Sequence, residues 1–411
     1  MAQGLALSRL RRAATVFGPG LVVMLADTDA GSVITAAQSG AQWGYRLLLL
    51  QFLLIPLLYV VQELTVRLAL CTGKGYGELI RLRFGRWMAL IAMATLAISC
   101  FGALVTEISG LSGAGQLFGI APWQTIVAVC SLIMVMVLTG SYQSVERVAL
   151  ALGAFELAFL LVAWRAHPDW TQIRRQLTQM PFGNHDYLYL LAANLGTSIM
   201  PWTVFYQQSA LIDKGLGLDQ LKAARVDTLA GAALCQVITA AVLIAAAAAF
   251  GSRGGGMVLD NVPQIAEAFT GVLGPGAGEV LFALALSGGA LVATIVVCLA
   301  TAWAVGEVTG KRHSLAQHPF EAPWFYGAFG LMLLAGGLLV GLGDNLVRLM
   351  LATGVINAVL LPVVLGFLFW LAWRELPQAY RLRGISAFAV GLLFTATAVL
   401  GLYTGIQGAL G

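Results

Sequence analysis

The chain contains 411 residues, of which 59% are hydrophobic and 10% are charged, and its formal net charge at pH 7 is +4. A soluble domain carries roughly 25% charged residues, so this composition excludes a water-soluble core. Apolar stretches of about 20 residues, the length of helix that crosses the ~30 Å hydrocarbon layer of a bilayer, recur along the chain. We therefore expect residues 1–411 to form one domain within a membrane.

Eleven apolar segments are long enough to cross the membrane. Because lipid offers no water to the backbone amides, runs of this length predict helices and not strands. The predicted spans are residues 13–37, 46–71, 87–118, 123–142, 146–166, 187–212, 221–250, 272–308, 323–343, 346–373 and 385–407. The sequence therefore predicts an all-α integral membrane protein with about 11 transmembrane helices.

Lysine and arginine residues concentrate on the cytoplasmic side of a membrane, so their positions test the span count. With a cytoplasmic N-terminus, 16 of them fall on the inner side: Arg9, Arg11, Arg12, Lys74, Arg81, Arg83, Arg86, Arg147, Lys214, Lys222, Arg225, Lys311, Arg312, Arg374, Arg381 and Arg383. Six fall on the outer side: Arg46, Arg165, Arg174, Arg175, Arg253 and Arg348. This asymmetry predicts a cytoplasmic N-terminus and an extracytoplasmic C-terminus.

The polar connection 167–186 divides the first ten spans into two groups of five. An odd number of spans in each half forces the second half to enter the membrane inverted. Transporters with inverted repeats have this arrangement, and corresponding helices of the two repeats are broken near the midplane. The sequence predicts a first repeat over residues 13–166, a second over residues 187–373 and an extra C-terminal helix over residues 385–407.

The first span contains two acids within an apolar run, in the segment Leu25-Ala-Asp-Thr-Asp-Ala-Gly-Ser32. Asp27 and Asp29 each cost several kcal/mol at this depth unless their charge is compensated. Gly31 and Ser32 favour a locally unwound backbone, whose carbonyls together with the carboxylates make an oxygen-rich cation site. Alternatively, Asp29 caps a half-helix that starts at Ala30. Capping and coordination can coexist.

The sixth span contains the matching feature, Gly196-Thr-Ser-Ile-Met-Pro-Trp202. Pro201 has no backbone N–H and leaves the carbonyl one turn earlier without its donor, so the helix is expected to break here. Met200 adds a thioether, a soft ligand that favours transition metals over Mg²⁺ and Ca²⁺. A proline kink with Met200 filling a gap is the alternative. The position of the break, in the first helix of the second repeat, favours a shared ion site.

Other polar residues lie within or near the apolar spans. Glu107 in the third span is a secondary ligand, a proton carrier or a group paired with another helix. Glu63 and Glu156 are further candidates, but both are predicted near the ends of their spans. Asn357 precedes Pro362 in the tenth span, so its amide faces a second predicted kink.

The residues that soluble enzymes use for catalysis are missing from the predicted spans. The chain contains no Gly-Lys-Ser/Thr loop that could hold a phosphate, and its histidines, His167, His185, His313 and His318, fall in connections. No Ser/His/Asp or Cys/His set can be assembled inside the membrane. We therefore expect no enzymatic activity, no catalytic residue and no cofactor.

At these positions the sequence resembles the Nramp family of divalent metal transporters, more strongly its divergent Nramp-related branch. The similar stretches are Gly18-Pro19-Gly20, Asp29-Ala30-Gly31-Ser32, Gln38 to Tyr45, Glu107, Gly196 to Pro201 and Leu360 to Pro362. They follow the order of the family over most of the chain. The resemblance implies a LeuT-like fold of ten helices in two inverted repeats, with broken helices 1 and 6 and, here, an eleventh helix.

The resemblance also implies a set of metal ligands. The family motifs are Asp-Pro-Gly-Asn in the first helix and Met-Pro-His in the sixth. Ser32 stands where the family has its asparagine ligand, and Asp27 is an acid that the family motif lacks. The implied metal site comprises Asp29, Met200, Ser32, the carbonyls near Ala26 and Thr197, and the carboxylates of Glu107 and Asp27.

Two departures concern proton coupling. Trp202 stands where the family has a proton-linked histidine, and Leu104 replaces an acid three positions before Glu107. The resemblance therefore does not extend to proton coupling through these positions. We place Trp202 and Asn357 in the second sphere of the predicted metal site.

The leading hypothesis is a secondary transporter that moves Mn²⁺, Mg²⁺ or Fe²⁺ by alternating access in a bacterial plasma membrane. Its expected partners are the metal ion and the lipid bilayer, without nucleic acid or an obligatory protein partner. A Na⁺-coupled symporter of a small amine on the same fold is the alternative, although Asp27 and Asp29 would repel a substrate carboxylate. A membrane receptor or enzyme without transport is disfavoured, because the sequence supplies neither a nucleophile set nor a cytosolic effector domain.

Overall fold

A computed structural model describes residues 18–139, 142–251, 256–274, 276–311, 314–315, 317–342 and 346–410, and this part of the chain contains helices and no strand. The first half contains α2 (Pro19–Asp27), α3 (Ala30–Trp43), α4 (Leu48–Thr72), α5 (Tyr76–Phe84), α6 (Arg86–Gln116), α7 (Pro122–Thr139), α8 (Tyr142–Gly153), η1 (Ala154–Leu157), α9 (Ala158–Arg165) and α10 (Trp170–Gln176). The second half contains α11 (His185–Ser198), α12 (Pro201–Asp213), η2 (Leu218–Gln220), α13 (Leu221–Gly251), α14 (Val262–Leu273), α15 (Ala277–Thr309), α16 (Pro323–Leu342), α17 (Leu346–Arg374) and α18 (Gly384–Leu410).

The number of spans agrees with the prediction. Among the described residues, ten helical stretches are long and apolar enough to cross a membrane, and eleven if α2 and α3 count as one broken span. The axes of α2 and α3 differ by 46°. Several predicted features lie outside the described residues: positions 13–17 of the first span, Arg9, Arg11, Arg12, Arg253, Arg312 and His313.

The predicted start of the eighth span, residue 272, is wrong. Residues 262–273 form the separate helix α14, which Gly274 ends in a left-handed conformation (φ 88°) before α15 begins at Ala277. The side chain of Asn261 caps α14 by accepting a hydrogen bond from the Gln264 N–H at 2.9 Å. Hydropathy alone did not separate the two helices, because α14 ends in the apolar pair Val272 and Leu273. The segment Gly274-Pro-Gly276 between the helices was the turn signal that could have placed the boundary.

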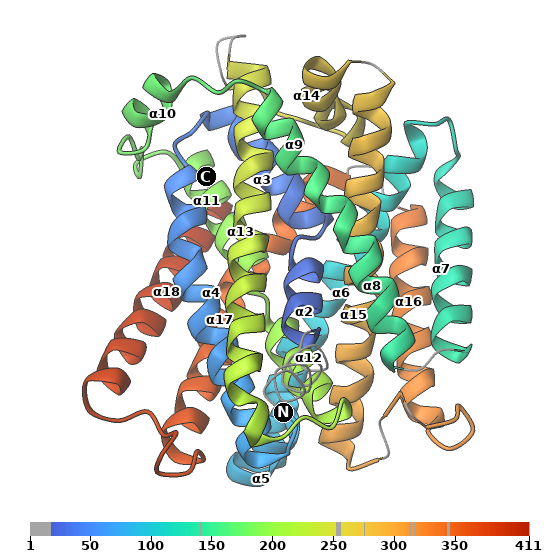
Figure 1. The fold of residues 1–411 in the computed structure, drawn as a ribbon, viewed down its shortest axis with the longest axis vertical. Helices are drawn as coiled ribbons and strands as arrows, with labels where there is room; N and C mark the ends of the chain where they lie inside the picture. Colours follow the sequence, from blue (N-terminus) through green and yellow to red (C-terminus); the bar gives the residue numbers. More distant parts are fainter. Residues whose placement is uncertain are drawn as a thin grey trace, which may run out of the picture.

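The helices α6, α13 and α15 pack around the broken pair α2 and α3, which lies in the middle of the bundle in Figure 1. Small residues let the backbones approach closely. At Gly40 on α3, an added Cβ would lie 2.3 Å from the carbonyl oxygen of Leu243 on α13. By contrast, α7 and α18 lie on opposite flanks and expose apolar side chains such as Leu132 and Val399, as helices that face lipid do.

A polar cluster fixes the start of α2, and we call it the α2 clamp. The carboxylate of Asp227 on α13 accepts hydrogen bonds from the backbone N–H groups of Gly18 at 3.3 Å and Gly20 at 2.8 Å. Beside Gly18, Lys214 forms an ion pair with Glu146 at 2.6 Å. The clamp supplies acceptors to N–H groups that a helix start leaves unpaired. It holds α2 against α8 and α13 at one end of the bundle.

Candidate metal site

The first helix is broken at the predicted position. α2 ends at Asp27, and Asp29 has an extended backbone (ψ 178°) before α3 starts at Ala30. The Asp29 carboxylate caps α3 by accepting a hydrogen bond from the Ser32 N–H at 2.6 Å. Glu107 on α6 accepts a second one from the Ala30 N–H at 3.0 Å. Two buried acids therefore meet at the positive end of the α3 dipole, which stabilises negative charge there.

The second break is also at the predicted position. α11 ends at Ser198, Ile199 and Met200 have non-helical backbone angles, and α12 begins with Pro201. Because Pro201 has no N–H, the carbonyl four residues earlier, on Thr197, loses its helical donor. This leaves a backbone oxygen available at the break.

Ser32 joins the two breaks. Its hydroxyl oxygen lies 2.8 Å from the carbonyl oxygen of Asp27 and 3.1 Å from the carbonyl oxygen of Thr197. A serine hydroxyl has a single hydrogen to donate, so it can satisfy only one of these carbonyls at a time. The breaks thus gather more oxygen acceptors than donors at one buried point, which is the arrangement that a cation needs.

The thioether of Met200 lies on the α12 side of the second break and is buried. The indole N–H of Trp202, also buried, donates a hydrogen bond to the Met200 sulfur at 3.1 Å. Trp202 therefore holds the sulfur through a contact of the kind by which outer residues orient metal ligands. The second-sphere role of Trp202 at a metal site stays a prediction.

The two remaining predicted acids have different surroundings. The Asp27 carboxylate approaches the thiol of Cys235 on α13, at 3.6 Å, and only its carbonyl meets Ser32. The Glu107 carboxylate accepts its hydrogen bond from the Ala30 N–H, one residue after Asp29. One oxygen of each acid, Oδ1 of Asp27 and Oε1 of Glu107, has no hydrogen-bond partner among the described residues. The break therefore holds unused carboxylate oxygens.

Ala26 and Asn357 complete the predicted set. Ala26 is fully buried in the last turn of α2. Asn357 is buried on α17, and neither atom of its amide has a hydrogen-bond partner within the described part of the chain. α17 reaches the second break at Gly354, where an added Cβ would lie 2.9 Å from a side-chain carbon of Thr197. Asn357 follows one turn later on the same helix.

Some polar residues around the breaks were not singled out in the sequence. Gln51 on α4 donates to Asn194 on α11 at 2.6 Å, and Asn194 donates to Ser39 on α3 at 2.8 Å. The sequence signal that could have identified these residues is an amide side chain within an apolar run. By contrast, Glu63 pairs with Arg67 and with Arg225, whose Nε lies 2.7 Å away, so its charge is already compensated.

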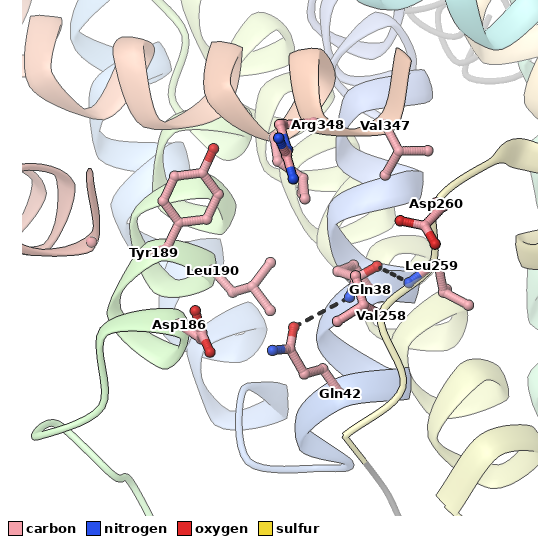
Figure 2. A pocket seen from close by; sticks show the side chains of 12 residues that line it. Gln38, Gln42, Asp186, Tyr189, Leu190, Val258, Leu259, Asp260, Val347 and Arg348 are labelled. Carbon is pink, nitrogen blue, oxygen red and sulfur yellow. Dashed lines mark hydrogen bonds between the residues drawn. The ribbon is translucent and has the colours of Figure 1, made fainter. Parts of the chain in front are cut away.

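A cavity of about 340 Å³ opens at the other end of α3, and Figure 2 shows its lining. Gln38 accepts a hydrogen bond from the Leu259 N–H at 2.9 Å and donates to Gln42 at 3.2 Å. Asp186 and Asp260 add two carboxylates to the walls. The α3 helix thus connects the break at Ser32 with a polar opening at the end of the bundle away from the α2 clamp.

No group of three or more His, Cys, Asp or Glu side chains within the described ranges has the spacing of a metal centre. Any metal bound at the breaks must therefore take backbone carbonyls, the Ser32 hydroxyl or the Met200 thioether besides the carboxylates. Such a donor set is mainly hard oxygen with one soft sulfur.

Comparison with known proteins decides the family. A family model described as natural resistance-associated macrophage protein-like, or Nramp, matches residues 20–407. The chain belongs to the Nramp family. The divalent metal cation transporter MntH of Brucella suis is 29% identical over 68% of this chain and 64% of its own length. MntH of Acidiphilium cryptum is 25% identical over 94% of this chain and 88% of its own length.

The match with the first relatives is partial, because the chain spans 64% of the Brucella suis protein and 63% of MntH from Agrobacterium fabrum. Among solved structures, a manganese transporter of Eremococcus coleocola is similar with a TM-score of 0.77, at 19% identity over 96% of this chain and 87% of that one. A nucleobase-cation-symport-1 family transporter gives a TM-score of 0.62, at 15% identity over 96% of this chain and 92% of that one. These similarities confirm the predicted fold and the predicted family.

Proposed function

We propose that this Nramp-family chain is a secondary transporter of divalent metal cations, with Mn²⁺ and Mg²⁺ as the leading substrates and Fe²⁺ as a further one. The observation that carries this proposal is the meeting of the two helix breaks at Ser32, where carbonyls of Asp27 and Thr197 compete for one hydroxyl hydrogen. The names of the relatives, divalent metal cation transporters, support the same substrate class.

The proposed ligand set follows from the contacts at the two breaks. The Asp29 carboxylate is the main ligand, because it is a buried negative charge that lies at the first helix break, where it caps α3. The other proposed ligands are Thr197, Ala26 and Asp27 through their carbonyls, Ser32 through its hydroxyl, Met200 through its sulfur, and Glu107 through its free carboxylate oxygen. A divalent ion would compensate charges that are otherwise costly at this depth.

Alternating access is proposed from the two ends of the bundle. In the described conformation the α2 clamp is formed at one end, while the cavity at Gln38 and Gln42 opens at the other. Opening of the clamp together with closure of the cavity would expose the breaks to the opposite side of the membrane. Trp202 and Leu104 occupy the positions that carry proton-linked groups in the family, so the proposal includes no coupling through them.

We also propose that the N-terminus is cytoplasmic, in a bacterial plasma membrane, which places the α2 clamp inside and the cavity outside. In intact cells a membrane-impermeant maleimide should label an Asp260→Cys variant and spare an Asp219→Cys variant. Both positions are exposed, on opposite ends of the bundle. Labelling of both variants after the cells are permeabilised is the control. The reversed pattern in intact cells would contradict the orientation.

Met200 should set the preference among metals. In proteoliposomes, Met200→Ala should lower the ability of Cd²⁺ to compete with Mn²⁺ by ~10-fold or more and leave competition by Mg²⁺ unchanged, because only the thiophilic ion needs the sulfur. Trp202→Phe keeps the buried ring and removes the N–H donor. It should weaken Cd²⁺ competition in the same direction. Equal loss for both ions would show that the sulfur is not a ligand.

One experiment tests the proposed function directly. Purified protein in liposomes should give saturable Mn²⁺ quenching of an internal dye, and Mg²⁺ should compete for the same sites. The Na⁺-coupled amine symporter is not favoured by the family match. Uptake of a labelled amine driven by a Na⁺ gradient, without saturable Mn²⁺ uptake, would overturn the proposal in favour of that alternative.

A further inference from the structure

The fifth span is irregular at one buried acid. α8 ends at Gly153, a single 3₁₀ turn, η1, covers Ala154–Leu157, and α9 continues from Ala158. A 3₁₀ turn within a longer helix often marks a functional hinge. Glu156 lies in this turn and is fully buried. Its position inside the bundle differs from the prediction, which placed it near the end of the span.

The carboxyl group of Glu156 is not compensated. Neither of its oxygens has a hydrogen-bond partner, and none of the ion pairs includes it, within the part of the chain that the structure describes. The titratable groups around it are Asp29 at the break, Glu107 on α6 and Cys235 on α13. None of these neighbours is a cation, so none of them compensates a carboxylate at Glu156.

The fourth neighbouring element, α15, packs against η1 and brings Gly289 to the Glu156 carboxyl group. An added Cβ at Gly289 would lie 2.6 Å from the carbonyl oxygen of Thr28 and 3.1 Å from Oε1 of Glu156. The Glu156 carboxyl group and the Thr28 carbonyl of the first helix break therefore both lie next to Gly289, which has no side chain to separate them. Both groups are hydrogen-bond acceptors when the carboxyl group is ionised, so a bound proton is what turns this approach into a favourable contact.

We propose that Glu156 is the proton-carrying residue of this transporter, and that it couples proton movement to the rearrangement of the first helix break. In the described conformation the Glu156 carboxyl group carries a proton and directs it at the Thr28 carbonyl. When the break, loaded with a divalent ion at Asp29, opens to the opposite side of the membrane, the proton passes to water on that side and the ion compensates the carboxylate that remains. After the ion has left and the break has returned, Glu156 takes up its next proton from the first side. The proposal rests on the proposed function, because the metal supplies that charge.

Glu156 also differs in place from the two proton-linked positions of the family. Those positions hold Trp202 and Leu104 in this chain, neither of which titrates. Glu156 reaches the first break through the fifth span. A chain without titratable groups at those two positions thus has Glu156, besides Asp27, Asp29 and Glu107, within reach of the moving segment.

The test records Mn²⁺ uptake and internal pH in the same proteoliposomes. Wild-type protein should acidify the lumen as Mn²⁺ enters. Glu156→Gln keeps a neutral side chain of the same shape, so it should retain saturable Mn²⁺ uptake and lose at least ~10-fold of the acidification per Mn²⁺. Glu279→Gln, at the start of α15 and away from the break, is the matched control and should acidify like the wild type.

A second measurement needs no variant. A carbodiimide that reacts with protonated carboxyl groups in apolar surroundings should modify Glu156 in the wild-type protein, as located by mass spectrometry of its peptides, and Mn²⁺ should reduce the modification. Mn²⁺ uptake without acidification, or an unmodified Glu156, overturns the proton proposal and leaves the metal proposal standing. Absence of saturable Mn²⁺ uptake in the wild type overturns both.

Discussion

Asp29→Asn should abolish saturable Mn²⁺ uptake in proteoliposomes. The Asp29 carboxylate lies at the first helix break and is buried next to Ser32. The Ser32 hydroxyl in turn contacts the Thr197 carbonyl at the second break. Asparagine keeps the shape and the oxygen that caps α3, but it removes the negative charge that a divalent ion requires. Loss of an outer residue of a metal site costs ~10–100-fold in affinity, so loss of the main ligand should exceed ~100-fold.

The matched control for Asp29 is Asp27→Asn. Asp27 lies two residues away in the same break and is equally buried, but its carboxylate faces Cys235 on α13. It was predicted as a ligand together with Asp29, and the structure brings only its carbonyl to Ser32. We expect the Asp27→Asn variant to retain saturable uptake. Wild-type uptake by the Asp29 variant, in protein that elutes as a single peak, would contradict the proposed site.

The second large effect is expected from Gly196→Ala, through stability. An added Cβ at Gly196 would lie 1.8 Å from the carbonyl oxygen of Gly354 on α17, and 2.6 Å from the backbone nitrogen of Ala358. Backbone atoms cannot rotate away, so α11 and α17 must separate. Overpacking of this kind costs about 1–3 kcal/mol or more. After mild heating, the detergent-solubilised variant should lose its monodisperse peak in size-exclusion chromatography.

Gly366→Ala is the control for this effect, because it lies on the same α17 and an added Cβ meets no atom within 4 Å. The Gly366 variant should elute like the wild type after the same heating. A Gly196→Ala variant as stable as the Gly366→Ala variant would show that α11 and α17 do not pack in the described register.

The sequence predicted the two helix breaks because each carries a local chemical cause. Proline at 201 removes a donor wherever the rest of the chain lies, and two acids followed by Gly31 and Ser32 disfavour a continuous apolar helix. Both breaks lie where the residues place them. The number of spans was predictable for the same reason, since the length of an apolar run sets whether it can cross the bilayer.

Contacts between distant segments were not predictable in this way. Nothing within residues 25–32 indicates that the Asp27 carboxylate faces Cys235 or that Ser32 meets Thr197, because both contacts depend on how α3, α11 and α13 pack. Glu156 was expected near a span end, and only the packing of η1 against Gly289 brings it to the first break. The separate helix α14 was missed because hydropathy does not weigh the turn signal Gly274-Pro-Gly276 that separates it from α15.

The sequence by itself determined that this chain is a helical membrane protein with interrupted first and sixth helices, because hydropathy, charge and proline chemistry act locally along the chain. The tertiary structure determined which oxygen atoms from distant segments lie close together. It brought together Ser32, Thr197 and Asp29, and it placed Glu156 over a glycine beside the first break. Such convergence depends on the close approach of helices far apart in sequence, which only small residues at their contacts allow.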